Sequence, residues 1–210
     1  DIEVVLTGNT YKAAFTESSP VSTFNSGNQI LLNASGSLQI DNRILTYMDN
    51  QWKAENEFSW SDITGKTNIT ALYPVYPDLD YIQENLYKNN SLEDILYVKD
   101  EFPAGNSIHL QFKHLFSLLT LHLEGNLQTY FQKIEVTCPA VSSIIPKSAE
   151  IVLADNGTHT TTIAQVSPSG NYSFIVPPVK NMVIAINMVT NGKKYTTLLE
   201  TKSFTGNKEY

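Results

Sequence analysis

Aromatic side chains in the first half of the chain are the groups best suited to binding chemistry. Exposed Trp and Tyr rings combine an apolar face with a polar edge, which lets them stack on sugar rings. A glycan-binding surface is therefore one hypothesis, and filling of a hydrophobic core is the alternative. The residues proposed for glycan binding are Trp52, Trp60, Tyr76 and Tyr81.

Other reactive residues do not form a recognisable catalytic or metal-binding set. The carboxylates cluster only in proline-flanked segments, where solvated turns are the more common role, and the lone Cys138 is expected to be a small buried hydrophobe. Phosphate-loop, nucleophile-elbow, dinucleotide-binding and zinc-protease motifs are absent from the sequence. We therefore expect no enzyme activity, no cofactor and no metal. The residues considered were Asp78, Asp80, Asp100, Glu101, His109, His114, His122 and His159.

Charge and composition exclude several classes of protein. The 210 residues carry a formal net charge of −7, whereas nucleic acids and anionic membranes attract basic surfaces. No apolar run approaches the roughly 18 residues of a membrane-spanning helix. A single cysteine rules out an internal disulfide framework. A globular protein that does not bind nucleic acid remains.

The composition predicts an all-β protein. The chain contains 18 Ser, 20 Thr and 19 Asn, and these side chains disfavour helix interiors but suit strands and turns. Apolar and polar residues alternate in several segments, as in half-buried strands. The expected strands are 2–6, 11–15, 29–33, 43–48, 68–73, 108–113, 118–123, 172–176 and the two arms of a hairpin around Asn191-Gly192.

Three local predictions are less regular. Asp155-Asn156-Gly157 is expected to form the turn of a second hairpin over 149–166. Ser91 to Tyr97 is expected to be either a short helix capped by Ser91 or a polar loop. The alternating residues around Leu115 to Ser117 predict two strands, or one long bent strand.

Pro103 to Asn106 divides the chain into halves of sandwich size. We expect an N-terminal β-sandwich domain at 1–104 and a C-terminal one at 105–210, with a boundary near 125 as the alternative.

The order of several segments resembles the fimbrillin-like proteins of Bacteroidetes, which include fimbrial subunits and their anchors. The resemblance covers about the middle half of the chain and is clearest in an A-x-Y-P strand end, a D-I-L turn and an F-K-H-L-F-S-L-L strand. The segments that carry it are 24–30, Trp52, Trp60, 69–74, 92–97 and 110–117.

This resemblance implies two transthyretin-like or immunoglobulin-like β-sandwich domains in tandem. It also implies export as a lipoprotein to the cell surface, the outer membrane or a fimbrium, with attachment through a lipid-bearing cysteine lost from a trimmed N-terminus. In that family an arginine-specific protease removes a leading segment, and the groove that it leaves accepts a strand from another subunit. Here the only arginine is Arg43, inside an expected strand, so no target for this trimming is visible near the first strand.

The C-terminal residues, from Phe204 to Tyr210, resemble the family's last turn but stop where a final strand would begin. One interpretation is a compact turn. The other is a strand-acceptor region around Phe204, Gly206 and Tyr210.

The sequence thus predicts a non-enzymatic, cell-surface fimbrial subunit or accessory protein that binds other subunits by strand addition, and adhesive contacts with a surface glycan or protein are compatible with it. The rival hypothesis is a surface glycan-binding lipoprotein that uses Trp52, Trp60 and nearby tyrosines.

Overall fold

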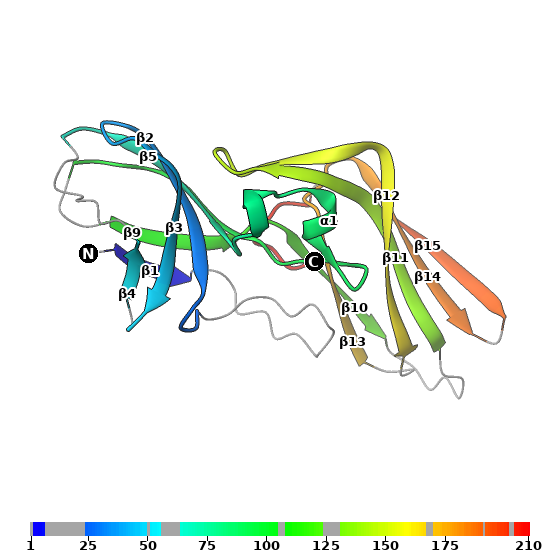
Figure 1. Cartoon of the computed structure of the whole chain (residues 1–210). Helices are drawn as coiled ribbons and strands as arrows, with labels where there is room; N and C mark the ends of the chain where they lie inside the picture. Colours follow the sequence, from blue (N-terminus) through cyan, green and yellow to red (C-terminus); the bar gives the residue numbers. More distant parts are fainter. Residues whose placement is uncertain are drawn as a thin grey trace.

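The computed structural model describes residues 2–6, 24–49, 51–55, 64–104, 108–123, 131–166, 170–190, 192–201 and 204–210. These residues form an all-β protein with one single-turn helix, as the composition predicts (Figure 1). The strands are β1 (Ile2–Leu6), β2 (Gln29–Gly36), β3 (Ile40–Met48), β4 (Gln51–Ala54), β5 (Thr67–Tyr73), β6 (Tyr87–Lys88), β7 (Ser91–Leu92), β8 (Leu96–Phe102), β9 (Ile108–His114), β10 (Ser117–Leu123), β11 (Phe131–Ile145), β12 (Glu150–Val166), β13 (Gly170–Val176), β14 (Met182–Thr190) and β15 (Lys193–Thr201). The helical elements are the 3-10 turn η2 (Pro77–Leu79) and α1 (Gln83–Leu86).

The first part of the chain builds a seven-stranded sheet that curls around its own core. Its strand order is β1-β9-β8-β5-β2-β3-β4, and the first and last strands of this order come into contact. Strand β9 illustrates how the sheet divides into two faces. Ile108, Leu110 and Phe112 are buried, while His109 and Gln111 between them are exposed. Alternate side chains from the curled sheet therefore fill one core, and the outer face is left to other contacts.

The second part is a sandwich of two sheets. A four-stranded sheet, β12-β11-β14-β15, faces the β10-β13 pair. The core between them contains Leu119 from β10, Phe174 from β13, Val136 from β11 and Ile184 from β14. Packing of two sheets through their apolar faces is the usual arrangement of a β-sandwich.

Strand β9 pairs within the first sheet although it follows residue 104. Strand β10 begins the second part, so the chain changes sheets at Leu115 and Phe116. This position lies between the boundary expected at 104 and the alternative near 125. The division into two domains stays a prediction.

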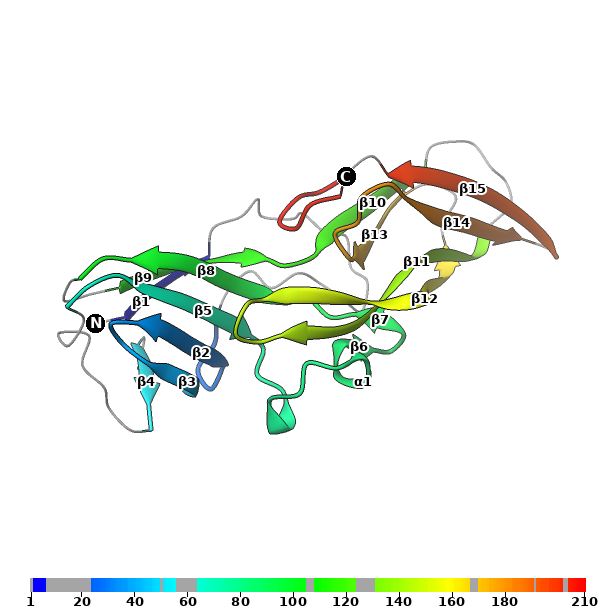
Figure 2. The same ribbon diagram turned by 90° about the horizontal axis from the view of Figure 1, so that it is seen from above.

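The two parts share a third apolar cluster. It contains Leu31 and Leu72 from the outer face of the first sheet, together with Val141, Ile144 and Ile175 from the second part. Strands β11 and β12 form a long hairpin whose closed end extends toward β2 and β5 (Figure 2). The hairpin thereby covers part of the outer face of the first sheet.

Two local predictions are wrong. Residues 155–157 do not turn the chain but lie inside β12, where Asn156 has a positive φ of 54° and the pairing with β11 shifts register nearby. The Asp-Asn-Gly sequence marks a β-bulge here, because asparagine tolerates a positive φ in a bulge as well as in a turn. Residues 91–97 contain no helix among the described elements: Ser91 and Leu92 form β7, and Leu96 begins β8.

The hairpin predicted at Asn191-Gly192 is confirmed by β14 and β15, and the bend near Leu115 separates two strands rather than one. The strand expected at 11–15 lies outside the described residues.

Candidate functional site

The aromatic residues expected to bind glycans are not on the surface where the structure describes them. Trp52, Tyr76 and Tyr81 are 8%, 6% and 2% exposed, and Trp60 lies outside the described residues. Trp52 packs edge-on against Phe24, with ring centroids 5.2 Å apart. The expectation of exposed rings is wrong for these three residues, because their faces are used in the cores.

Tyr76 and Tyr81 instead stabilise the connection between β5 and α1 through hydrogen bonds. The Tyr76 hydroxyl donates to Glu93 Oε2 at 2.6 Å, and the Tyr81 hydroxyl donates to the Pro74 carbonyl at 2.7 Å. Burial raises the pKa of both phenols, and the Glu93 carboxylate raises that of Tyr76 further. Both groups are buried polar atoms with partners, which is a structural role.

The four histidines lie in separate surroundings. His109 is exposed on β9, while His114 Nδ1 lies 2.8 Å from the largely buried carboxylate of Asp94. His122 contacts Asn171, and His159 Nε2 lies 2.8 Å from the Asn90 carbonyl. Within the described ranges, no three potential metal-ligating side chains come together.

The C-terminal residues pair with β10 in a parallel direction. The Leu118 N–H donates to the Lys208 carbonyl at 2.9 Å, and the Tyr210 N–H donates to the Leu118 carbonyl at 2.9 Å. The Thr120 N–H then donates to the Tyr210 carbonyl at 2.8 Å. Part of the edge expected to be a strand acceptor is therefore occupied by the chain's own residues.

This segment fits tightly against the junction of β9 and β10. Phe204 is buried, and its ring stacks on that of Tyr210 with centroids 4.2 Å apart. Gly206 lies so near the backbone that a Cβ there would be 2.4 Å from the carbonyl oxygen of Leu115. Only glycine permits such an approach.

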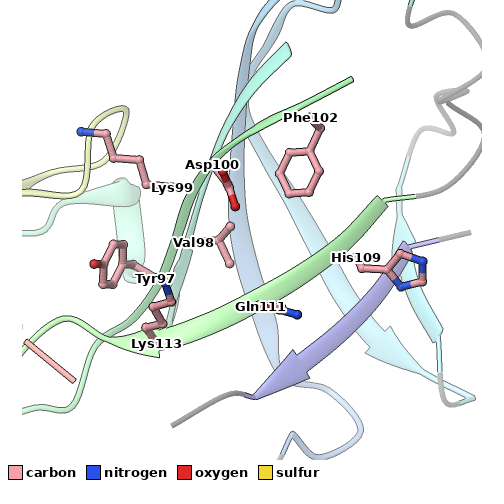
Figure 3. A pocket seen from close by; sticks show the side chains of 8 residues that line it. All are labelled: Tyr97, Val98, Lys99, Asp100, Phe102, His109, Gln111 and Lys113. Carbon is pink, nitrogen blue, oxygen red and sulfur yellow. The ribbon is translucent and has the colours of Figure 1, made fainter. Parts of the chain in front are cut away.

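A second strand edge is open between β8 and β9 (Figure 3). The two strands pair only at Leu96–His114 and Tyr97–Lys113 and then separate, although both continue for five more residues. The space between them is about 250 Å³. Sequence analysis did not reveal this opening, because each strand taken alone has a regular pattern.

Backbone groups of β8 face this opening. The Leu115 N–H donates to the Ile95 carbonyl at 2.7 Å, which fixes the alternation of the antiparallel ladder. By that alternation, Lys99 and Glu101 direct their backbone groups toward β9. The Glu101 N–H is instead bound by Asp100 Oδ1 at 2.9 Å, so a neighbouring side chain occupies a donor that a partner strand would use.

Comparison with known proteins agrees with this architecture. The sequence matches the fimbrillin-like family over residues 11–210. The chain belongs to the fimbrillin-like family. Among curated proteins no sequence matches it.

Solved structures with the same fold come from Bacteroides. A candidate cell adhesion protein from Bacteroides ovatus aligns with a TM-score of 0.62 at 13% identity, covering 98% of this chain and 88% of its own. Another candidate cell adhesion protein, from Bacteroides uniformis, gives 0.56 at 12% identity and covers 88% and 84%. A fimbrial protein from Bacteroides ovatus gives 0.54 at 15% identity, and this fimbrillin-like chain spans 47% of its length.

Membership in this family assigns the protein to a structural, non-enzymatic class found at the cell surface or in fimbriae. Among the described segments, no helix has the length and apolar character required to cross a bilayer.

Proposed function

We propose that this fimbrillin-like protein is a fimbrial structural or accessory subunit that joins other subunits by β-strand addition. The observation that carries the proposal is the opening between β8 and β9, where Val98 to Phe102 lack a strand partner on one edge among the described residues. An unpaired edge of this kind is a template for an extended segment of another chain.

The open edge has the features that strand addition needs. The other edge of β8 pairs along its whole length with β5, so β8 is held straight. Lys99 and Glu101 together present alternate donors and acceptors, and only the Asp100 side chain must move away to release the Glu101 N–H. The added strand gains main-chain hydrogen bonds, which is how strand addition supplies affinity.

The acceptor predicted around Phe204, Gly206 and Tyr210 becomes a smaller, second proposal. The pairing of β10 with β13 continues to Leu123, whereas the described C-terminal residues pair with β10 only as far as Thr120. In this proposal, a strand from another subunit takes the place of the C-terminal residues beside β10.

Attachment to the outer membrane through an N-terminal lipid, and adhesive binding to a host or bacterial surface, stay predictions that depend on the family resemblance. The buried positions of Trp52, Tyr76 and Tyr81 give no support to stacking on glycans at these rings.

The test compares two substitutions at Lys99. Lys99→Pro removes the backbone N–H that faces the opening, and proline is tolerated on such an edge. Lys99→Ala removes the same side chain but keeps the N–H. Light scattering over a range of concentrations measures the mass of the wild type and of both variants.

We expect masses that rise with concentration for the wild type and for Lys99→Ala, and a monomer for Lys99→Pro. Equal association by the two variants would remove the β8 edge from the mechanism. A wild type that stays monomeric throughout would contradict addition between copies of this chain.

A further inference from the structure

A polar cleft lies where the tip of the β11–β12 hairpin covers the first sheet. Its volume is about 640 Å³, within the range of small-molecule sites. The hairpin tip is held by a hydrogen bond from Thr70 Oγ1 to the Lys147 carbonyl at 3.1 Å and by an ion pair of 2.5 Å between Lys147 and Asp41. These contacts keep the two walls of the cleft in a fixed relation.

Strand register places two rows of polar side chains on the floor of this cleft. Asn33, Thr70 and Lys99 lie opposite one another across β2, β5 and β8. Ser35, Asn68 and Glu101 form the next row along the same three strands. Directly opposed residues share a face of the sheet. The floor therefore offers amides, hydroxyls and charged groups in a fixed array.

Two polar groups at the cleft have no partner among the described residues. Asn33 is only 5% exposed, and its Nδ2 lacks an acceptor there. Its orientation is set, because Oδ1 accepts a hydrogen bond of 2.9 Å from the Asn42 N–H. On the opposite wall, the buried Ser148 Oγ also lacks a partner. Buried polar groups in native proteins are nearly always satisfied, so both point to a bound molecule.

The charges at the cleft compensate one another. Asp41 is paired with Lys147, and Glu101 accepts from Lys66 Nζ at 2.6 Å. Lys99 and Asp100, of opposite charge, complete the charged lining. A charged ligand would upset this balance, whereas a neutral ligand rich in hydroxyl groups matches the many donors and acceptors.

We propose that this cleft binds a neutral polyhydroxylated ligand, a saccharide unit, whose hydroxyl groups are bound by Asn33 Nδ2 and Ser148 Oγ. The binding site involves none of the aromatic residues discussed above. It shares Lys99 and Glu101 with the open edge of β8, but the cleft is lined by their side chains, whereas strand addition uses their backbone groups.

The experiment measures binding of neutral trisaccharides of glucose, mannose, galactose, xylose and N-acetylglucosamine to the full chain. Saturation-transfer NMR detects binding and calorimetry gives Kd, with a trigalacturonide as the charged comparator. Asn33→Asp keeps the oxygen that accepts from Asn42 and replaces the donor. Asn28→Asp is the matched control, since Asn28 Oδ1 accepts from the Asn25 N–H at 2.8 Å outside the cleft.

A second variant protects the test against misfolding. Gln39→Ala combined with Asn68→Ala alters two exposed residues of the lining. Circular dichroism and thermal unfolding check that each variant is folded.

We expect at least one neutral trisaccharide to bind saturably to the wild type. Asn33→Asp and the double variant should each raise the Kd about tenfold or more. Asn28→Asp leaves the Kd unchanged. The proposal is overturned if no neutral trisaccharide binds, and the cleft would then be assigned to ordered water. It is also overturned if the trigalacturonide binds more tightly than every neutral trisaccharide. Affinities of both cleft variants equal to that of the wild type would overturn it as well.

Discussion

Replacing Gly206 by alanine tests whether the C-terminal segment is held as the structure shows. The new Cβ would lie 2.4 Å from the Leu115 carbonyl oxygen and 3.1 Å from that of His114. Non-bonded contacts of a carbon atom are favourable from about 3.5 Å upward, so both distances are too short. Neither oxygen belongs to a side chain that could rotate away. The variant must therefore shift either the segment or the β9–β10 junction.

Two responses compete, and their costs can be compared. Overpacking strain in a well-packed region costs about 1–3 kcal/mol. Releasing the segment instead loses its four backbone hydrogen bonds to Phe116, Leu118 and Thr120, worth about 0.5–1.5 kcal/mol each, and exposes Phe204. Local strain is the cheaper response. We expect the free energy of unfolding to fall by about 1–3 kcal/mol, which lowers Tm by about 2–12 °C for a chain of this size.

Gly65→Ala is the matched control. Its Cβ would meet Ser37 Cβ at 3.7 Å and Ser37 Oγ at 3.9 Å, both ordinary contacts, so this variant should be neutral or slightly stabilised. Calorimetry measures Tm for both variants, and hydrogen exchange measures protection of the Leu118, Thr120 and Tyr210 amides. Equal melting temperatures for the two variants, with unchanged protection at these amides, would refute the close packing of Gly206.

Three further measurements probe the cores. Burial raises the pKa of the Cys138 thiol to about 12, so it should not react with a disulfide reagent at pH 8 until the protein is unfolded; reaction in the native state would contradict its burial. Burial likewise raises the pKa of Tyr87 to about 12. The neutral phenol therefore contributes its full stabilisation below the ordinary pKa of 10.0, and this stabilisation is lost as the pH rises toward 12. Absorbance at high pH should show this phenol ionising together with unfolding, and ionisation at its ordinary pKa in the folded protein would be inconsistent with the structure. In Trp60→Phe, the remaining Trp52 emission should be poorly quenched by acrylamide, whereas quenching as strong as that of free tryptophan would place this ring on the surface.

Local patterns predicted most strands because alternation and turn residues are properties of neighbouring positions. The Asn191-Gly192 hairpin and the alternating β9 depend on nothing farther away. Asp155-Asn156-Gly157 shows the limit. The same residues permit a turn or a bulge, and pairing with β11 on both sides of them decides for the bulge.

Ser91 to Tyr97 fails for a different reason. A capping pattern favours a helix locally, but Ile95 and Leu96 are fully buried and β8 pairs with β5 over seven residues. Tertiary pairing outweighs a preference of a few tenths of a kcal/mol per residue.

The two candidate binding regions depend on register between distant strands. Asn33, Thr70 and Lys99 become neighbours only when β2, β5 and β8 align, and the opening at β8 exists only because β9 leaves it after two pairs. The aromatic residues illustrate the reverse case. The sequence shows that Trp52 and Tyr81 are present, but the exposure of their side chains depends on the packing around them.

The apolar cluster shared by the two parts has a mechanical consequence. A subunit in a surface filament carries tension along its length. Here the β11–β12 hairpin lies across the first sheet, and Val141 and Ile144 are packed with Leu31 and Leu72. Pulling the two parts away from each other must shear this cluster together with the Thr70–Lys147 and Lys147–Asp41 contacts. The subunit should therefore extend in a force spectrometer as a single element with one rupture event, rather than as two springs in series.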